Sequence, residues 1–243
     1  MSRRAGVTLL EMLIAITLFS LIMAGSFTAL RAGMSGMRRT NERFLANRRV
    51  LGAQKLLERQ LAGFMPVVAL CIAAGGPGPT GELPFFQGEI ETMRFVSSYS
   101  LGEGARGAPR ILEFQVIARD NGPGVRLVVN EHLYTGPLGA GRFCFGMAAD
   151  PVSGGAAPRF TPVEVGPGSF VIADRLAACR FLYKETLPPP LLERWLVRWI
   201  HPIWPKAIRI EMTPLEDDPG KAGPVSLTIP VFVTRTPAGV YFD

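Results

Sequence analysis

The 243-residue sequence predicts an α+β fold in which one long N-terminal helix packs against an antiparallel β-sheet. Two observations carry this prediction. An apolar run at 7–30 continues into a helical pattern that contains no proline up to about Gly63. After Pro66 the pattern changes to short β-type runs separated by glycine and proline. We expect the C-terminal half of the helix to pack on the sheet.

The run at 7–30, VTLLEMLIAITLFSLIMAGSFTAL, is long enough to cross a bilayer, which needs about 20 apolar residues. It is longer than the core of a cleaved secretory signal, about 7–15 residues, and no small-x-small cleavage site closes it. The run therefore predicts a retained transmembrane anchor. It contains one carboxylate, Glu11, which costs about 2.5–3.5 kcal/mol near the apolar phase unless a partner compensates for it.

The string GVTLLE at 6–11, preceded by two arginines, resembles the class III signal of type IV pilins and type II secretion pseudopilins. In that family a prepilin peptidase of the inner membrane cuts after the glycine and methylates the new terminus. The resemblance implies cleavage between Gly6 and Val7, with 1–6 as leader peptide. It also implies that Glu11 pairs with the free α-ammonium of a neighbouring subunit. The family usually has phenylalanine in place of Val7. The other interpretation is an ordinary signal anchor with a chance glutamate.

The segment 31–65 is predicted to be an amphipathic, basic helical stalk. Met37, Phe44 and Leu51 recur at spacings of seven on one side of it. Its basic residues are Arg31, Arg38, Arg39, Arg43, Arg48, Arg49, Lys55 and Arg59, and its acidic residues are Glu42 and Glu58. The basic face is either solvated or laid on lipid headgroups, or, in a sharper interpretation, docked on acidic faces of neighbouring subunit helices.

This basic stalk conflicts with the topology that the resemblance implies. The positive-inside rule keeps such a segment in the cytoplasm, and only Arg3 and Arg4 in the leader oppose it. Because the prepilin motif is the more specific signal, we expect a single-pass protein of the bacterial inner membrane. Its N-terminus would be cytoplasmic and its domain, 66–243, would be periplasmic.

Composition allows one such domain, since about 180 residues remain beyond the stalk. Cys71, Cys144 and Cys179 are too few for a disulfide scaffold and match no metal spacing. An oxidising periplasm permits one bridge, but the sequence does not choose the pair. We interpret all three cysteines as small buried apolar residues.

The domain should be rich in antiparallel strands. We expect strands at Thr92–Tyr99, Arg110–Ala118, Val125–Leu133, Arg175–Tyr183, Ala207–Thr213 and Val225–Thr234. We expect loops at 75–81, 119–124, 148–168 and 214–224, and a short helix at Leu191–Ile200. Leu112, Phe114 and Val116 alternate with polar residues, so at least one face of the sheet should be covered. Pro230 indicates that the last strand is an edge strand or begins there.

Two stretches of this domain resemble the minor pseudopilin J of type II secretion systems. The first is FQG at 86–88, followed by MRFVS at 93–97 and two strands. The second is CRFLY at 179–183, followed by Trp195 and Trp199 and then a strand that a proline opens. The resemblance implies a pilin-like fold. It also implies a subunit that joins I- and K-type pseudopilins in a tip complex, which starts or caps a pseudopilus of major pseudopilin and drives folded proteins through the secretin.

Three tryptophans, Trp195, Trp199 and Trp204, are candidates for a partner-facing patch, because tryptophan is enriched at interface hot spots. The alternative interpretation is core packing around a short helix. The sequence favours neither interpretation over the other.

Little in the sequence indicates catalysis. His132 and His201 are the only histidines, and no Ser or Cys motif accompanies them, so we interpret both as structural. The acidic cluster 216–218 lacks the spaced ligands of a calcium loop and is expected to be a solvated turn. We therefore expect no enzyme, cofactor, metal or nucleic-acid partner. The alternatives are a type IV pilus minor pilin of the W type and a membrane-tethered periplasmic enzyme with a deep polar pocket.

Overall fold

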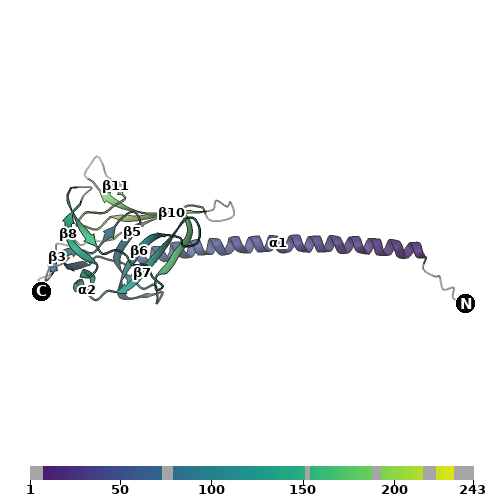
Figure 1. Cartoon of the computed structure of the whole chain (residues 1–243), viewed down its shortest axis with the longest axis horizontal. Helices are drawn as coiled ribbons and strands as arrows, with labels where there is room; N and C mark the ends of the chain where they lie inside the picture. The colour runs from purple at the N-terminus through teal and green to yellow at the C-terminus, as the bar shows by residue number, and fades with distance from the viewer. Residues whose placement is uncertain (1–7, 73–78, 151–153, 188–192, 216–222, 233–243) are drawn as a thin grey trace. The chain divides into compact units, whose positions relative to one another are not determined.

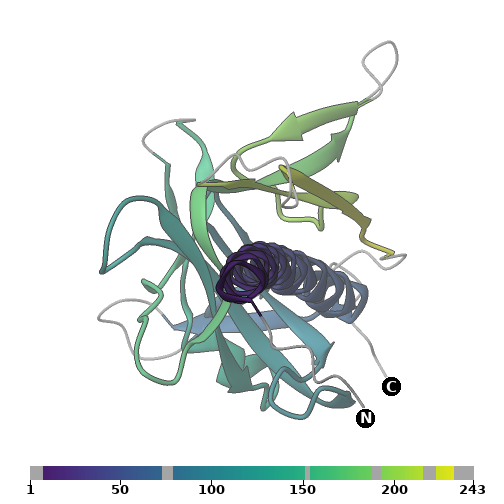
Figure 2. The same ribbon diagram turned by 90° about the vertical axis from the view of Figure 1, so that its right-hand side faces the viewer.

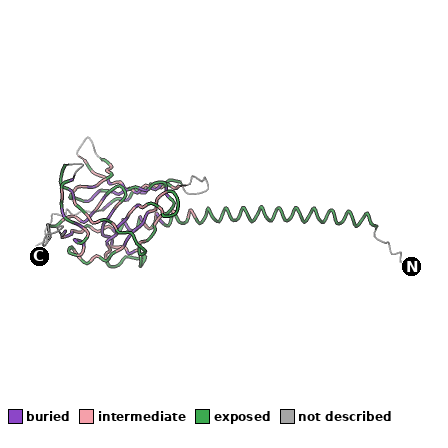
Figure 3. The backbone as a smooth tube through the Cα atoms, in the orientation of Figure 1, coloured by how far each residue is buried: buried purple, intermediate pink, exposed green. Residues whose placement is uncertain are grey.

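The computed structural model describes residues 8–72, 79–150, 154–187, 193–215 and 223–232 (Figure 1). The chain divides into two units, Met1–Arg48 and Arg49–Asp243. Helix α1 (Leu9–Ala62) begins in the first unit and ends in the second, so the helix predicted to end near Gly63 is confirmed. Figure 3 shows that its residues are exposed along most of its length and become buried only in its last turns.

The second unit is built on an antiparallel sheet in the order β1-β5-β6-β7-β10-β12-β13, with β4 beside β5 and β11 beside β10. Its strands are β1 (Phe64–Met65), β4 (Gln87–Gly88), β5 (Thr92–Tyr99), β6 (Arg106–Ala118), β7 (Val125–Leu133), β10 (Phe170–Thr186), β11 (Glu193–Leu196), β12 (Ala207–Pro214) and β13 (Val225–Pro230). A helix packed on such a sheet is the α+β, pilin-like architecture that the sequence predicts.

The last turns of α1 fill the main core. Leu57 and Leu61, four residues apart and therefore on one face, are 0% and 2% exposed and belong to the same cluster as Phe95 and Phe114. Each buried leucine stabilises the fold by about 1.5–3 kcal/mol. Figure 2 shows the strands of the second unit curving around the last turns of α1.

Strand β10 produces this curvature by changing its partner. Its first part, up to Leu176, pairs with β7, and its second part, from Leu176 onward, pairs with β12. The change occurs at irregular pairings around Arg175, the one non-glycine residue in the described ranges with a positive φ, 59°. An irregularity of this kind bends a strand and increases its twist.

A second layer covers the other face of β5 and β6. It consists of the hairpins β2 (Val68–Ile72)–β3 (Pro79–Pro84) and β8 (Cys144–Ala149)–β9 (Ala156–Phe160), with the short helix α2 (Pro137–Gly141). Val96 and Ile111 from the sheet share its separate core with Phe85 and Ala140. Both faces of the central strands are therefore buried.

One cysteine interpretation was wrong. Cys71 of β2 and Cys144 of β8 form a disulfide across 73 residues of sequence, and only Cys179 is a free, buried thiol. The two partners meet because two hairpins pack side by side, and residue spacing carries no signal for such a tertiary contact.

The expected strands are confirmed in position, and β5 and β7 have the predicted bounds. The helix expected at Leu191–Ile200 was wrong, since Glu193–Leu196 is strand β11 in the described part of that segment. In this pairing Arg194 lies opposite Glu185 and Glu193 lies opposite Thr186. Two ion pairs join the strands, with 2.7 Å from Arg194 Nη2 to Glu185 Oε2 and 2.6 Å from Lys184 Nζ to Glu193 Oε1.

Two loop assignments also need correction, because β3 lies partly within 75–81 and β9 lies within 148–168. Both strands contain proline and small residues, so their composition resembles that of a loop. Strand β13 is an edge strand of the described sheet, as Pro230 predicts, but the strand ends at this residue and does not begin there. The acidic cluster 216–218 lies outside the described residues.

Candidate functional site

The N-terminus of α1 is organised by Thr8 and Glu11. Glu11 N–H donates to Thr8 Oγ1 at 3.3 Å, and Met12 N–H donates to the Thr8 carbonyl at 3.2 Å. Thr8 therefore caps the helix, and Glu11 lies in its first turn, where a carboxylate is favoured by the positive end of the helix dipole. Gly6 and Val7, the predicted processing residues, lie outside the described residues.

The apolar part of α1 has the properties of a membrane anchor. It contains an 18-residue stretch of mean hydropathy 2.1, of which none is buried. Thr17, Ser20 and Thr28 each donate their hydroxyl to a carbonyl of the preceding turn, at 2.9, 2.8 and 2.8 Å. These polar groups are thus satisfied inside the helix, as lipid requires. Glu11 is the ionisable residue of the apolar run 7–30, and its side chain is exposed.

The stalk that follows places cations beside exposed rings. The Arg31 guanidinium lies 4.7 Å from the centroid of Phe27, and that of Arg48 lies 5.6 Å from the centroid of Phe44. Each pair is spaced four residues apart, so the two side chains lie on one face of the helix. Arg31 and Arg48 therefore lie beside apolar side chains of the helix, so the arginines of the stalk are not confined to its polar side.

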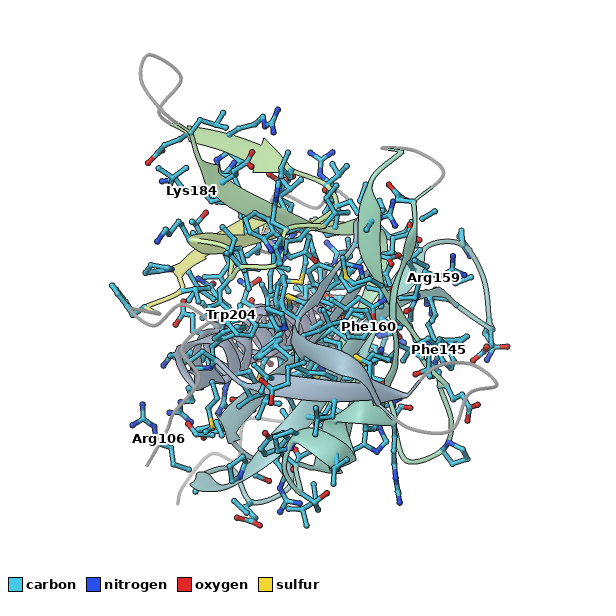
Figure 4. The ribbon with its side chains drawn as sticks, turned by 90° about the vertical axis from the view of Figure 1, so that its left-hand side faces the viewer. Arg106, Phe145, Arg159, Phe160, Lys184 and Trp204 are labelled. Atoms are coloured by element: carbon cyan, nitrogen blue, oxygen red, sulfur yellow. A yellow bond between two sulfur atoms is a disulfide. The ribbon has the colours of Figure 1, made fainter. Side chains whose placement is uncertain are left out.

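The three candidate tryptophans lie in different environments. Trp199 and Trp204 are 4% and 7% exposed and belong to the main core; the Trp199 indole donates to Ile203 O at 2.7 Å. Trp195, in β11, is half-buried, and the Arg209 guanidinium lies 4.0 Å from its ring centroid. Figure 4 shows Trp204 toward the middle of the domain and Lys184 out at the β10–β11 hairpin. The packing of Trp199 and Trp204 follows the core interpretation, and partner contact at Trp195 stays a prediction.

The two histidines lie in separate networks. His132 Nε2 is 3.0 Å from Glu113 Oε2, and His201 Nε2 is 2.9 Å from Glu185 Oε1. Burial raises the pKa of the Cys179 thiol to about 12, so this thiol is protonated and unreactive at neutral pH. Within the described ranges, no three His, Cys, Asp or Glu side chains are grouped so that they could hold a metal ion.

A polar cleft of about 250 Å³ lies between β4 and the β8–β9 hairpin. Its charged lining includes Glu89, Arg159 and the ion pair Arg198–Asp150, in which Nη1 and Oδ1 are 2.5 Å apart. Asp150 and Arg198 neutralise each other, and no Ser, Thr, Cys, Lys or His lies among the described residues that line the cleft.

Sequence reasoning missed a buried ion pair of the domain, between Arg94 and Glu113, whose side chains are 0% and 5% exposed. A charged residue in a strand normally indicates a solvent-facing position, and nothing in the sequence predicts the second layer that covers it. The available signal was that both residues alternate with core positions in neighbouring strands, where an antiparallel hairpin can place them opposite each other.

Comparison with known families gives one result, at the N-terminus. Residues 1–27 match the family model described as the prokaryotic N-terminal methylation motif, which is a prepilin signal of the type IV pilin and pseudopilin type. No curated protein matches the chain. The matched range contains the Thr8–Glu11 helix start and most of the apolar anchor.

Proposed function

Because the methylation motif and the fold both support the pilin-like superfamily, we propose that this protein is the J-type minor pseudopilin of a type II protein secretion system. A prepilin peptidase would cut between Gly6 and Val7 and methylate Val7. The mature subunit would join I- and K-type pseudopilins in a tip complex above a pseudopilus of major pseudopilin. Its role is mechanical, as is typical of pilin-like proteins.

The observation that carries this proposal is the prepilin motif at 1–27, joined to a capped helix start at Thr8 and a carboxylate at Glu11. An ionised carboxylate in an otherwise apolar anchor needs a cationic partner. The α-ammonium that cleavage creates at Val7 of a neighbouring subunit has the right charge, and an axial offset of about 6 Å between the two subunits would bring it beside Glu11. Processing and assembly would therefore be linked through one ion pair.

The disulfide supports the periplasmic location of the domain independently of the motif. Disulfides persist in oxidising compartments such as the periplasm and are rare in the cytoplasm. The Cys71–Cys144 bridge is in the second layer of the domain, so its presence favours a domain outside the inner membrane. This outweighs the basic stalk, whose arginines favour the cytoplasmic side.

The J-type assignment is supported by the sequence resemblance at 86–97 and 179–210, a region that contains residues of strands β5, β10 and β12. The same architecture suits a type IV pilus minor pilin, so partner choice must separate the two. Co-purification with I- and K-type pseudopilins would support the secretion role. Co-purification with pilus minor pilins in their place would overturn it.

The first experiment is mass spectrometry of the mature N-terminus after co-expression with a prepilin peptidase. We expect a chain that starts at methylated Val7, and an uncut chain when Gly6→Ala is introduced. An intact Met1 terminus in the unsubstituted chain would contradict the proposal and leave a basic, membrane-anchored domain.

A further inference from the structure

The cleft between β4 and the β8–β9 hairpin contains an arginine that a buried carboxylate holds in place. The side chain of Asp150, directly after β8, is 1% exposed, while that of Arg198 is 37% exposed. Burial of a carboxylate is unfavourable unless a cation offsets it, so this ion pair fixes the position of the guanidinium. Arg198 lines the cleft, and a guanidinium has further N–H groups besides the one that bonds to Asp150. The cleft therefore contains a positioned donor.

The β8–β9 hairpin brings a second cation to the same cleft. Ala148 lies opposite Ala157, and Arg159 is two residues beyond Ala157, so the three side chains lie on one face of the hairpin. All three residues line the cleft. Arg159 is exposed, and it has no ion-pair partner in the described ranges. The two alanines leave room beside its guanidinium for a group of a ligand.

Glu89 is the exposed anion among the described residues that line the cleft, and it limits the charge of a ligand. Gly88 and Trp199 form an antiparallel bridge, so the next residues outward, Glu89 and Arg198, lie on neighbouring backbones. A ligand with one negative charge can pair with the two arginines. A dianion such as phosphate would be repelled by Glu89, while an N–H group of the ligand could donate to this carboxylate.

A small apolar hollow adjoins the cleft, and Pro158 lines both. Met147 and Ile203, which also line the hollow, are 42% and 47% exposed. The hollow has a volume of about 10 Å³, so it is too small to hold a separate ligand. An apolar group can lie over Met147 and Ile203 when it is attached to a polar group that enters the cleft.

These features fit part of a large ligand better than a whole small molecule. The cleft has a volume of about 250 Å³, and pockets that enclose small molecules usually have volumes of about 300–1,000 Å³. An extended peptide can place one side chain in the cleft and leave the rest of its chain outside. Its backbone also supplies the N–H groups that Glu89 can accept.

We propose that this cleft binds an extended segment of a partner protein. The segment places a carboxylate between Arg159 and Arg198 and an apolar side chain over Met147 and Ile203. A guanidinium binds a carboxylate through two parallel hydrogen bonds, which makes the contact selective in geometry as well as in charge. The proposal goes beyond the proposed function and does not depend on it, because every residue of the site lies in the second unit.

The test measures fluorescence anisotropy of labelled peptides with the full chain in detergent. Each peptide has blocked ends and carries one glutamate and one leucine at a different spacing. We expect saturable binding of at least one peptide, and an affinity about tenfold lower when glutamine replaces its glutamate. Arg159→Gln should cause a similar loss. Ala148→Leu should also weaken binding, because it fills the cleft without a change of charge.

The matched control is Arg106→Gln, which makes the same change of charge at another exposed arginine. Figure 4 shows Arg106 and Arg159 on opposite sides of the domain in that view. Peptide binding by this variant should equal that of the unsubstituted chain. Urea unfolding of each variant in detergent separates loss of binding from loss of folding.

Four results would overturn the proposal. The first is that none of the glutamate peptides binds saturably. The second is an equal loss of binding in Arg159→Gln and Arg106→Gln, which would assign the effect to net charge. The third is displacement of the peptide by free propionate at the same concentration as by unlabelled peptide, which would make the site one for small carboxylates. The fourth is a dimer of the unsubstituted chain in light scattering that Arg159→Gln abolishes, which would make a second copy the occupant.

Discussion

Arg94 and Glu113 form a buried ion pair across the central strands β5 and β6, with 2.7 Å between Arg94 Nε and Glu113 Oε1. Arg94 also donates from Nη1 to Gln87 Oε1 at 2.9 Å and from Nη2 to Thr161 O at 3.0 Å. Burial lowers the pKa of Arg94, and the charge of Glu113 opposes that shift. The hydrogen bond from Arg94 to Thr161 O thus links the segment that follows β9 to strand β5 of the sheet.

Removing one partner of this pair should strongly destabilise the domain. Arg94→Met removes the buried cation and leaves the Glu113 carboxylate with its contacts to His132 and Asn130, and we expect the free energy of unfolding to fall by about 3–5 kcal/mol. Urea unfolding of the full chain in detergent measures this change. The double variant Arg94→Met with Glu113→Leu should recover part of the loss, because no unpaired charge is then buried. A loss below about 1 kcal/mol in the single variant would show that the pair does not hold the layer.

Removing the disulfide should loosen the second layer. Replacing Cys71 and Cys144 by alanine releases a constraint across 73 residues and should lower the free energy of unfolding by about 2–4 kcal/mol. Maleimide labelling supplies an independent measurement. The denatured, unreduced chain from membranes should react at one thiol, that of Cys179. Reaction at all three cysteines would mean that the domain matured in a reducing compartment.

The Cys179 thiol should make stability fall at alkaline pH. Its pKa is raised in the folded domain to about 12, first by burial and then by Glu91, while the unfolded thiol ionises near 9. The folded state therefore binds the extra proton between these values. This contribution is fully present below about pH 9 and is lost as pH rises toward about 12.

Between pH 8 and pH 10, the free energy of unfolding should thus fall by about 1 kcal/mol more in the unsubstituted chain than in Cys179→Ala. Urea unfolding at both pH values gives the two differences. Parallel declines in the two chains would show that other groups account for the alkaline loss.

The parts of this fold that sequence patterns predict are those in which local pattern and burial coincide. Strands β5 and β7 alternate or run apolar between clear turn residues, and their predicted bounds hold. Helix α1 is equally well predicted from the sequence, because a long segment with a helical pattern and no proline favours a continuous helix. At the helix N-terminus, the residue types at 6–11 are enough to indicate the prepilin signal, and the family match at 1–27 agrees with it.

The second layer was not predictable for a physical reason. Strands β3 and β9 contain proline and β8 contains glycine and alanine, so the local propensity of these three favours loops, while β2 is only five residues long. They are strands because they pack on the sheet and are held together by a disulfide whose partners are distant in sequence. The β11 strand was missed in a similar way, since its tryptophan and leucine suit a helix as well as a hairpin.

Gly88 should not tolerate a side chain. A Cβ at this position would lie 2.8 Å from the Trp199 Cβ and 2.8 Å from the Tyr183 ring, in the contact where Trp199 N–H donates to Gly88 O at 2.7 Å. We expect Gly88→Ala to lower the free energy of unfolding by about 1–3 kcal/mol through overpacking. Gly102→Ala is the control, because its Cβ would meet Ser100 Oγ only at 4.0 Å, and its change should stay within about 0.5 kcal/mol. Equal changes in both variants, read from the same urea titrations, would contradict this account of the Trp199 contact.

A substitution at Glu11 should affect assembly of the subunit without affecting its processing. Glu11→Gln keeps the size of the side chain and its place in the first turn but removes the charge that would pair with the α-ammonium of a neighbouring subunit. Cleavage after Gly6 should continue, because the leader is unchanged, while co-purification with other pseudopilins should fall about tenfold, the equivalent of about 1.4 kcal/mol. Thr17→Val is the control, since that hydroxyl donates only within its own helix, to Ile14 O. If Glu11→Gln associates as well as the unsubstituted chain, the anchor carboxylate has no role in assembly, and its burial in lipid would need a different cationic partner.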